Sequence, residues 1–589
     1  MKYLWSIAPF QREVAKDWAQ RLNIPPLLAQ CLLNRGVQQP GVAHDFLQPR
    51  LKHLADPFLI PNMSAAVDRL FQAREKREPL VIFGDYDVDG VTSTALLLEV
   101  FKCLGWTATS YLPHRLEEGY GLSRDGVENC LRKHPVTLLL AVDCGSTALD
   151  TITWLKERGV DVVVLDHHQV SHPLPPAVAV VNPQIRKHSQ LPESTQARND
   201  MSPAAQFSEL CSVGLAFKLA HALVKRARES HLAGAEDFDL RPLLDLVALG
   251  TIADIVPLTG ENRILVSAGL TWLGTTRRLG LTALKQLAQC PAVMGVRDVA
   301  YQLAPRLNAS GRLETAEDSL RLILATALPE ALGLAESLDR HNRDRQDIER
   351  RILEEALVSI LARFDPAKDF VIVVGQESWH LGVVGVVAAR VLQRFYRPTI
   401  VVGGDGQYWR GSGRSIPGFD LAAALRQCSD LLVRHGGHAM AAGVTLYPEK
   451  LDAFRERLNQ LAREALEGDQ LRPPLRLDAE VALAELSLEC ISALDQLEPV
   501  GQANPPVQLC ARGVIQQRPA RRLGGGQQHV KMWVGNHNEG IETLWWGAGD
   551  SPLPSGPFDL AFTPQINEYN GRRSVQLKLI DWQDTAPGS

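Results

Sequence analysis

The sequence predicts an α/β protein. A parallel-sheet domain is joined by a long helix to a second, smaller α/β domain, and a small β-barrel lies at the C-terminal end. The first observation is that apolar, β-branched runs alternate with helical patterns from about residue 79 onward. Apolar strands separated by helices are typical of a parallel sheet covered on both faces. The second is that short strands with Gly and Pro turns follow residue 470, which favours a small barrel or sandwich.

The elements of the first half follow from these patterns. Residues 1–60 show helical patterns interrupted by prolines and are predicted to be an N-terminal helical segment. Residues 61–328 are predicted to form the first α/β domain, and its polar, patternless stretch 186–210 a surface loop. Within this domain, strands are expected at 80–83, 137–143, 160–166 and 177–182, with helices at 91–104 and 147–158 and helical periodicity from 211 onward.

The second half begins with the connecting helix, predicted over residues 329–366. From Pro329 to Phe364 there is one Gly and no internal Pro, and the alternative is two helices packed back to back. Residues 367–468 are predicted to form the second α/β domain, and residues 469–589 the barrel. The second domain should contain strands at 370–375 and 398–404 and helices at 382–395, 420–433 and 448–466.

The composition excludes several classes of protein. Of the 589 residues, 45% are hydrophobic and 22% charged, as in ordinary globular proteins. The formal net charge of −5 excludes binding to nucleic acid through overall charge, although not through a local basic groove. The nine cysteines form no CxxC pair, which argues against a zinc ribbon or a thioredoxin site. There is no signal-peptide pattern and no apolar run of about 18 residues, so we expect a reduced, cytoplasmic protein without membrane contact.

Three carboxylates follow the first predicted strand directly. Asp85, Asp87 and Asp89 lie within five residues, before a helix that starts near Val91. The carboxyl ends of strands in open α/β sheets are where ligands bind. Such closely spaced like charges need compensation, which a divalent cation usually supplies. The alternative for this segment alone is a solvated turn with an Asp N-cap.

Two further strands end in the same chemistry. The second strand ends in Asp143, and the third ends in Asp166, followed by His167 and His168. Neutral imidazole and carboxylate are ligands suited to Mn²⁺ or a comparable metal. Asp254 is an isolated acid in an apolar stretch and, taken alone, could equally be a helix cap. Together these residues predict an acidic cage for two metal ions, an arrangement that hydrolyses phosphate esters.

Several motifs carry a family resemblance. They are DYDVDG at 85–90, DHH at 166–168, GTIADIVPL at 250–258, RLNASGR at 306–312, WHLGVVG at 379–385, GSGRS at 411–415, GGHAMAAG at 436–443 and GQANP at 501–505. In this order, over about residues 60–585, they resemble the RecJ exonucleases of the DHH phosphoesterase superfamily. The resemblance implies a DHH catalytic domain at 61–328, a DHHA1-like substrate-binding domain at 367–468 and an OB-fold-like nucleic-acid-binding domain at 469–589.

The resemblance also implies roles for the acidic cage. Two divalent ions, Mn²⁺ or Mg²⁺, would be held by Asp85, Asp87, Asp89, Asp143, His167 and Asp254. Asp143 would be shared by both ions, His168 would face the scissile phosphate, and Asp166 would orient the histidines. Of these, the catalytic set would be Asp87, Asp89, Asp143, His167, His168 and Asp254. Some family members have His where this chain has Phe83, which cannot bind a metal, so the first ion would depend more on Asp85 and water.

Arginines are the residues best suited to bind phosphate. By resemblance, Arg115 and Arg306 would form a pocket for a 5′-phosphate, whereas Ser412, Arg414 and His438 would hold backbone phosphates. Ordinary surface arginines are the alternative. The remaining predicted substrate-binding residues are Asn308, Ser310 and Arg312 of the RLNASGR motif, His380 in the WHLGVVG motif, and His168.

The predicted barrel has a basic stretch. Residues 499–538 contain no Asp or Glu, and their cations are Arg512, Arg518, Arg521, Arg522 and Lys531. Trp533, Trp545 and Trp546 are close by. Cations beside aromatic rings in a small β-domain resemble an OB-fold platform for stacked single strands. Burial of Trp533 and Trp545 in the core is the alternative.

The resemblance implies an exonuclease specific for single-stranded DNA. It would act from the 5′ end, release 5′-mononucleotides and serve DNA repair and recombination. The enzyme would be a monomer. Its implied partners are a single-stranded-DNA-binding protein and a helicase. One alternative is a DHH enzyme for pyrophosphate or short oligonucleotides, which generally lacks the basic barrel. Another is a strand-binding protein without activity, which a degenerate cage would indicate, but every carboxylate of these motifs is present.

Overall fold

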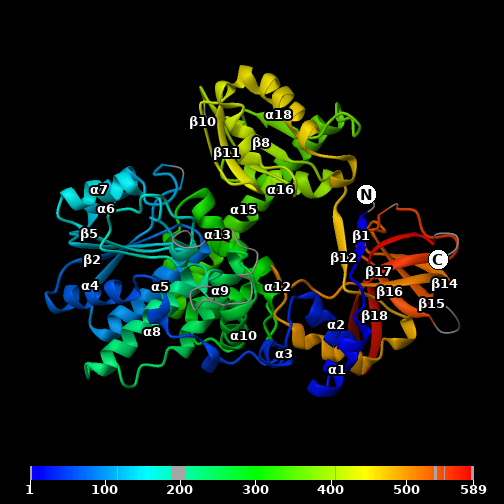
Figure 1. Ribbon diagram of the computed structural model, residues 1–589. Helices are drawn as coiled ribbons and strands as arrows, with labels where there is room; N and C mark the ends of the chain where they lie inside the picture. The colour runs from blue at the N-terminus through cyan, green and yellow to red at the C-terminus, as the bar shows by residue number, and fades with distance from the viewer. Residues whose placement is uncertain are drawn as a thin grey trace. The chain divides into compact units, whose positions relative to one another are not determined.

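The computed structural model describes residues 3–115, 117–187, 207–404, 406–535, 540–549 and 551–585. The chain divides into two compact units, each assembled from segments distant in sequence. The parallel-sheet unit consists of residues 49–347 and 499–504. The barrel unit consists of residues 1–48, 348–498 and 505–589. Figure 1 shows the elements of each unit.

The parallel-sheet unit is built on a five-stranded sheet in the order β3-β2-β4-β5-β6. Its parallel strands are β2 (Leu80–Gly84), β3 (Ala108–Tyr111), β4 (Leu138–Val142), β5 (Asp161–Leu165) and β6 (Ala179–Val181). Every residue of β2 and β4 is buried, as expected for strands covered on both faces. Because β3 and β4 flank β2 on opposite sides, the strand order reverses there, which is where open α/β sheets bind ligands.

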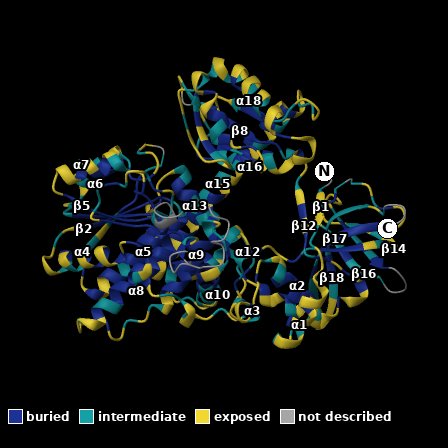
Figure 2. Ribbon diagram, viewed as in Figure 1, coloured by how far each residue is buried: buried dark blue, intermediate teal, exposed yellow. Residues whose placement is uncertain are grey.

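Helices cover both faces of this sheet, and its strands are buried between them (Figures 1 and 2). The helices α4 (Met63–Glu75), α5 (Val88–Leu104) and α8 (Ser212–Glu229) share the largest apolar core with Leu80 and Ile82 of β2. The helices α6 (Arg124–Lys133) and α7 (Leu149–Glu157) pack on the other face with Val81 and Phe83. The alternation along β2 follows from the two-residue period of a strand.

Helices form the rest of the parallel-sheet unit. They are α9 (Leu244–Ala253), α10 (Gly260–Gly274), α11 (Leu279–Leu287), α12 (Val296–Asp298), α13 (Ala304–Leu313) and α14 (Glu317–Leu324), with the short helical segments η1 (Leu51–His53), η2 (Pro57–Leu59), η3 (Pro183–Lys187), η5 (Arg241–Leu243) and η6 (Val299–Leu303). The connecting helix α15 runs without a break over Leu328–Leu361. The single-helix prediction is therefore confirmed, and the two-helix alternative is wrong.

The barrel unit contains the second α/β domain. Its sheet has the order β10-β11-β9-β8-β7, and only β7 and β8 are parallel. The strands are β7 (Ile372–Gln376), β8 (Thr399–Gly404), β9 (Trp409–Arg414), β10 (Arg434–Gly437) and β11 (Ala441–Leu446), and the helices α16 (Val384–Phe395), α17 (Leu421–Arg426) and α18 (Leu451–Ala465). The helix predicted at 420–433 is shorter than expected, because η7 (Ser429–Leu431) and β10 follow it.

The C-terminal strands close into a barrel. They are β14 (Leu509–Leu523), β15 (His529–Gly535), β16 (Ile541–Trp545), β17 (Phe558–Tyr569) and β18 (Arg572–Asp584). The strand order is β14-β15-β16-β18-β17, and β17 pairs with β14 to complete the circle. Of the predicted barrel and sandwich, the structure has the barrel. Smaller elements precede it: η8 (Pro448–Lys450), η9 (Gly468–Leu471), β13 (Ala479–Glu480), η10 (Leu483–Glu485), α19 (Leu488–Leu494) and η11 (Asp495–Leu497).

The N-terminal segment belongs with the barrel. Its helices are α1 (Arg12–Leu22), α2 (Pro26–Asn34) and α3 (Pro40–Leu47), and their apolar residues, such as Trp18 and Leu28, join the barrel core. The strand β1 (Leu4–Ile7) pairs in parallel with β12 (Pro474–Leu477). The sequence did not predict β1, because its pairing partner lies far along the chain.

Three sequence-based expectations concern features outside the two cores. The central part of the loop predicted at 186–210, residues 188–206, lies outside the described residues. All nine cysteines are free thiols. Among the described residues, the structure contains no helix with the length and apolar character needed to cross a membrane.

Candidate metal centre and phosphate-binding residues

The turn after β2 holds the first carboxylates. Asp87 caps α5, and its Oδ1 accepts hydrogen bonds from the backbone N–H of Asp89 (2.9 Å) and Gly90 (3.1 Å). A Cβ on Gly90 would lie 2.5 Å from the Asp85 carbonyl oxygen, so only glycine fits this close turn. Asp85 is 2% exposed, and its buried Oδ1 has no hydrogen-bond partner among the described residues. The predicted Asp N-cap is therefore present, but it explains only the position of Asp87 and not those of Asp85 and Asp89.

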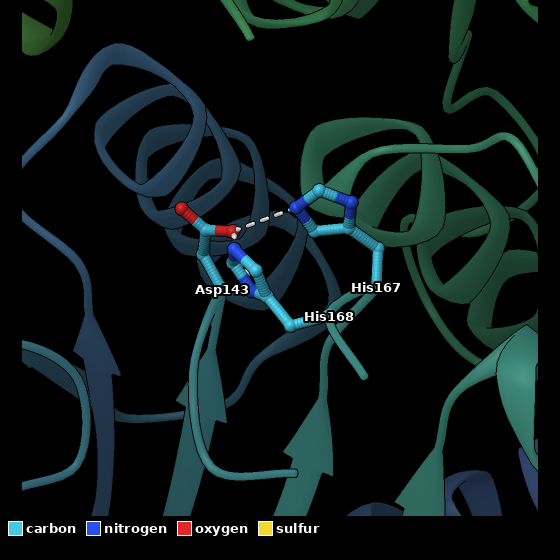
Figure 3. A group of neighbouring side chains, drawn as sticks. All are labelled: Asp143, His167 and His168. Carbon is cyan, nitrogen blue, oxygen red and sulfur yellow. Dashed lines mark ion pairs between the residues drawn. The ribbon is translucent and has the colours of Figure 1, made fainter. Parts of the chain in front are cut away.

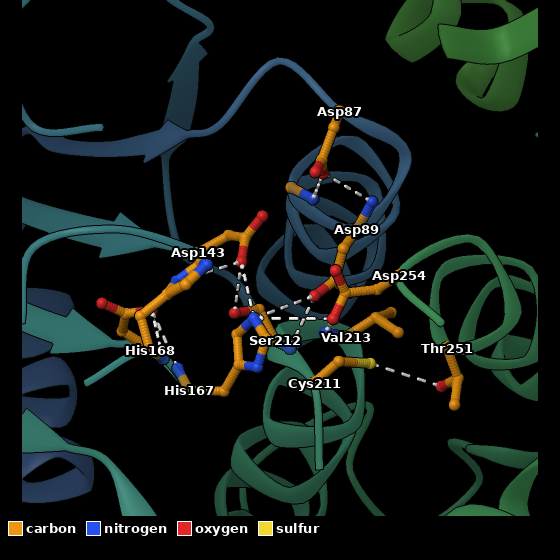
Figure 4. Close-up of polar contacts among 12 residues, drawn as sticks. Asp87, Asp89, Asp143, His167, His168, Cys211, Ser212, Val213, Thr251 and Asp254 are labelled. Atoms are coloured by element: carbon orange, nitrogen blue, oxygen red, sulfur yellow. Dashed lines mark hydrogen bonds and ion pairs between the residues drawn. The ribbon is translucent and has the colours of Figure 1, made fainter. Parts of the chain in front are cut away.

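Asp89 and Asp143 are joined through the start of α8 (Figure 4). The Asp89 carboxylate accepts the backbone N–H of Ser212 and Val213, both at 2.7 Å. The Ser212 hydroxyl donates to Asp143 Oδ1 at 2.8 Å. Asp143 has a φ of 64°, in the left-handed region that Asp tolerates better than most residues. The start of α8 therefore stabilises these buried charges without neutralising them.

His167 is close to carboxylates from three different elements. Its Nε2 lies 3.5 Å from Asp143 Oδ1, 3.6 Å from Asp254 Oδ2 and 4.0 Å from Asp89 Oδ2. Figure 3 shows the Nε2 side of the ring turned toward Asp143. Burial, and secondarily the charge of His168, lowers the pKa of His167 to about 4. A neutral imidazole whose buried Nε2 has no hydrogen-bond partner in the described chain is suited to bind a metal.

His168 is held by Asp166. Its Nδ1 lies 2.8 Å from Asp166 Oδ1. Burial lowers the pKa of His168, but the hydrogen bond and charge of Asp166 outweigh burial and raise the pKa to about 9. Burial also raises the pKa of Asp166, and here the hydrogen bond and charge of His168 prevail and hold that pKa well below its usual range. The geometry fits the predicted orienting role of Asp166.

The carboxylates are crowded enough to need a cation. Burial first, and then neighbouring carboxylates, raises the pKa of Asp85 to about 8, of Asp89 to about 7 and of Asp254 to about 8. The pKa of Asp143 is raised well above its usual value for the same reasons. A divalent cation would remove this repulsion. The donor set of carboxylate oxygens and imidazole nitrogen therefore fits Mn²⁺ or Mg²⁺.

All six predicted metal ligands fall into groups that could hold an ion. Within each group the ligand atoms lie within 4.8 Å of one another: Asp85, Asp87 and Asp143; Asp89, Cys211 and Asp254; Asp143, His167 and His168. Cys211 was not predicted. Burial and nearby carboxylates raise the pKa of its thiol well above the usual value, and its Sγ contacts Thr251 Oγ1 at 3.5 Å, so without metal it is a protonated thiol.

Phe83 occupies apolar core. Its ring is fully buried and stacks on Tyr111, with ring centroids 5.5 Å apart. It belongs to the cluster that packs against α6 and α7, whereas Asp85 and Asp87 lie in the turn after the strand. Packing therefore explains why an aromatic residue stands at this position.

A pocket of about 310 Å³ adjoins the acidic turn. Its lining residues are Asp85, Tyr86, Asp87, Arg115, Tyr120, Ala253, Asn308, Gly311 and Arg312. The Arg115 guanidinium lies 5.0 Å from the ring centroid of Tyr86. Burial first, and then the charges of Arg115 and Arg345, lowers the pKa of Arg312 to about 10. Two cations beside an acidic cluster are suited to hold a phosphate next to bound metal.

Other residues of the RLNASGR motif support the pocket or lie away from it. Asn308 Oδ1 accepts the backbone N–H of Val88 at 3.2 Å and so also holds the start of α5. Ser310 is 1% exposed and its hydroxyl contacts Ser319 at 3.1 Å. Its position therefore favours packing over the predicted contact with substrate. Arg306 is paired with Asp339 at 2.9 Å and is not among the lining residues, whereas Arg312 and Arg115 both line the pocket.

The second α/β domain brings together the phosphate-binding candidates of the barrel unit. Ser412 and Arg414 lie on β9, and Arg414 Nη1 donates to Ser412 Oγ at 2.7 Å. A Cβ on Gly385, in the first turn of α16, would lie 3.2 Å from Ser412 Oγ. His438 is exposed, and its N–H bonds to Ala441, the residue that pairs with Arg414. His380 is half-buried, and its Nδ1 accepts the Gly382 N–H at 3.2 Å.

The structure corrects the basic stretch of the barrel. Arg512 pairs with Glu480 and Asp559, and Lys531 with Glu542. Arg522 donates to two backbone carbonyls. Acids from other strands thus neutralise cations that look unpaired in the sequence. Arg518 and Arg521 are exposed, with no carboxylate paired to them within the described residues.

The barrel's tryptophans differ in position. Trp533 is half-buried, with the Arg518 and Lys531 cations 5.6 and 5.3 Å from its ring centroid. Trp545 packs against the barrel core, and Trp546 is 53% exposed. The predicted burial is therefore partial for Trp533 and Trp545. Arg518, Arg521 and Trp533 remain as a cationic, aromatic face.

Comparison with known proteins identifies each domain. Residues 79–251 match the family model of the DHH family N-terminal domain, residues 368–464 the DHHA1 domain, and residues 477–581 the RecJ OB domain. The single-stranded-DNA-specific exonuclease RecJ of Dickeya dadantii is 36% identical over 582 residues, covering 95% of this chain and 96% of that protein. The chain belongs to the RecJ family. The RecJ of Bacillus subtilis is 35% identical, over 98% of this chain and 71% of that protein.

Solved RecJ structures agree with this assignment. The crystal structure of RecJ in complex with Mn²⁺ from Thermus thermophilus matches with a TM-score of 0.82 and 28% identity, over 99% of this chain and 80% of that chain. A RecJ exonuclease bound to manganese matches with a TM-score of 0.58 and 33% identity, over 70% of this chain and 97% of that chain. The resemblance predicted from the motifs, and the fold class with it, is confirmed.

Two residues that contact the site, Ser212 and Tyr120, were not predicted from the sequence. Ser212, which binds Asp143, follows a patternless segment and has no local signal. Tyr120, whose hydroxyl lies 3.1 Å from His168 Nε2, is an isolated tyrosine between two glycines. Its glycine flanks could have indicated a special turn, but not its contact with His168.

Proposed function

We propose that this chain is a metal-dependent exonuclease that hydrolyses single-stranded DNA from the 5′ end and releases 5′-mononucleotides, in DNA repair and recombination. The observation that carries the proposal is the group of carboxylates and imidazoles at the carboxyl ends of β2, β4 and β5. The RecJ relatives are named single-stranded-DNA-specific exonucleases, which supports a polymeric substrate over the small substrates of other DHH enzymes.

Two divalent ions, Mn²⁺ or Mg²⁺, are proposed as cofactors. Asp85, Asp87 and Asp143 would hold one ion. Asp89, His167 and Asp254 would hold the other, and Asp143 would be shared, because it belongs to two of the ligand groups. Bound ions would stabilise the charge on the attacking and leaving oxygens and lower the pKa of the attacking water. RecJ structures from Thermus thermophilus with Mn²⁺ and with Mg²⁺ support both metals.

The protein's own residues would bind and orient the scissile phosphate. Hydrolysis joins a water oxygen to phosphorus and breaks its bond to the 3′-oxygen of the terminal nucleotide. Each cut leaves a new 5′-phosphate on the shortened strand. The cations of Arg115 and Arg312 in the pocket are proposed to hold the terminal phosphate, and Asn308 to keep the acidic turn in place. His168, oriented by Asp166, would face the phosphate that is cut.

The barrel unit is proposed to hold the rest of the strand. Ser412, Arg414, His380 and His438 would contact backbone phosphates, and the face with Arg518, Arg521 and Trp533 would bind longer strands by charge and stacking. Under this proposal residues 61–328 perform the chemistry, helix 329–366 connects the domains, residues 367–468 bind substrate, and residues 469–589 bind the longer strand.

Partners and cellular setting are also proposals. An exonuclease for single strands needs a duplex to be opened, so a helicase is a suitable partner. A single-stranded-DNA-binding protein would cover the same strands. We propose that the enzyme acts as a monomer in the cytoplasm, where the free state of all nine cysteines would be maintained.

Digestion of end-labelled DNA tests the proposal. Single strands and duplexes labelled at either end are incubated with Mn²⁺, with Mg²⁺ or with EDTA, and Asp143→Ala serves as the inactive control. A 5′ label should appear in mononucleotides from the start, whereas a 3′ label should remain on shortening strands. Equal attack on duplex, loss of the 3′ label first, or hydrolysis of only pyrophosphate and short oligonucleotides would refute the proposal.

A further inference from the structure

The loop between β3 and α6 places a tyrosine against the active-site imidazole. The Tyr120 hydroxyl lies 3.1 Å from His168 Nε2, while Asp166 Oδ1 lies 2.8 Å from His168 Nδ1. Both ring nitrogens are therefore engaged, one by a buried carboxylate and the other by a phenol. A ring held at both nitrogens cannot rotate without losing a hydrogen bond.

The loop that carries Tyr120 is anchored independently. The Glu118 carboxylate accepts the Tyr111 hydroxyl at 2.6 Å and the His114 backbone N–H at 2.7 Å. It also accepts a hydrogen bond from the Asn129 side chain. These three bonds fix the loop to its neighbouring elements, so Tyr120 is presented from a preformed turn.

The backbone on either side of Tyr120 is specialised. Gly119 and Gly121 have φ values of 84° and 70°, in the left-handed region that side chains rarely adopt. The two glycines adopt this conformation without the strain that a side chain would bring. Tyr120 lines that pocket together with Asp85 and Arg115.

Packing does not explain the tyrosine. Tyr120 is 61% exposed, so its ring removes little apolar surface from water. Its ring contacts are Tyr86 and His168, with centroids 6.4 and 6.2 Å apart and steep interplanar angles of 72° and 90°. Tyr120 is exposed, yet its ring contacts the pocket wall and a histidine of the site. This indicates that function, and not packing, determines the residue at this position.

We propose that Tyr120 is a positioning residue that holds the imidazole of His168 in one orientation beside the acidic cage. The inference rests on the proposed function and adds to it a residue outside the predicted site. Tyr120 supplies the second hydrogen bond that orients the ring before substrate arrives. Preorientation lowers the barrier of the chemical step more than it changes ground-state binding, so the loss of this bond should reduce kcat and leave KM unchanged.

Kinetics of Tyr120→Phe test this directly, because the variant keeps the ring and removes only the hydroxyl. Single-turnover and steady-state rates are measured with Mn²⁺ on single-stranded DNA and on bis-p-nitrophenyl phosphate. The kcat should fall about tenfold, as expected for one lost orienting hydrogen bond, with KM within about twofold. Tyr301→Phe is the matched control, since Tyr301 is 71% exposed in η6 of the same unit and its variant should match the wild type.

A double-mutant cycle separates positioning from a general structural role. On the His168→Ala background, Tyr120→Phe should cause no further loss, because the group it positions is gone. A wild-type kcat for Tyr120→Phe, or an equal loss with and without His168, would overturn the proposal. If the wild type hydrolysed only bis-p-nitrophenyl phosphate, the proposed DNA substrate would be wrong, and the same cycle would still decide the role of Tyr120.

Discussion

In the metal-free protein, Asp143→Asn is expected to stabilise the fold although it abolishes hydrolysis. Asp143 is 1% exposed, and burial together with its neighbouring carboxylates raises its pKa well above the usual value. Asparagine keeps the oxygen that accepts the Ser212 hydroxyl and removes the buried charge. The variant therefore loses a repulsion that only bound metal would otherwise relieve.

The sign and size of the effect follow from proton binding. A carboxyl whose pKa is higher in the folded than in the unfolded state binds more protons when folded at intermediate pH. Its contribution therefore lowers the free energy of unfolding as pH rises above the unfolded value of about 3.9. The loss is about 1.4 kcal/mol per pH unit until the folded pKa is reached. Asp143 therefore lowers the stability of the metal-free fold progressively as the pH rises above about 4, and the asparagine variant avoids this cost.

Unfolding in EDTA at several pH values measures this difference. The variant should match the wild type near pH 4, and its stability advantage should grow as the pH is raised. Mn²⁺ should stabilise the wild type much more than the variant. Asp237→Asn is the matched control, because Asp237 is exposed in the same unit. A variant that is less stable than the wild type near pH 8, or a difference independent of pH, would refute the reasoning.

Three further predictions concern individual side chains. Arg518→Gln with Arg521→Gln should lower the log–log salt slope of single-strand binding by about 1.4. Adding Arg522→Gln should change the slope little, because Arg522 already donates to backbone carbonyls; a further drop of about 0.7 would contradict this. Phe83→His should destabilise the fold by about 2 kcal/mol or more without reducing the Mn²⁺ concentration needed for activity, and a reduced requirement would show that position 83 reaches the metal. Ile255→Asn should raise stability by about 1 kcal/mol in thermal unfolding, since Ile255 has a φ of 58°; an unchanged midpoint would exclude strain there.

The sheet and the acidic cage could be predicted because their signals are local. A fully buried parallel strand needs a continuous apolar run, and β2 and β4 are such runs. Asp85 and Asp143 follow these runs directly, and parallel strands end at the same edge of a sheet. Grouping of the ligands at that edge follows from the topology.

Other parts depend on contacts between distant segments. The start of α8 binds Asp89 across more than a hundred residues, and β1 pairs with β12 near the other end of the chain. The ion pair of Arg306 with Asp339, 33 residues away, is another such contact. In the barrel's basic stretch, Arg512 likewise forms ion pairs with acids on other strands. Such ion pairs join residues that are distant in the sequence, so a short stretch of sequence does not reveal them.

The most direct test of the central claim is a count of Mn²⁺ ions bound per chain, made alongside exonuclease activity. Free Mn²⁺ is followed by electron paramagnetic resonance while metal is added to the metal-free wild type and to Asp143→Asn. The wild type should bind two ions, with activity appearing over the same concentration range, and the variant should lose at least one ion and the activity. Binding of no ion by the wild type, or full activity in the variant, would contradict the assignment of these carboxylates and imidazoles as the hydrolytic metal centre.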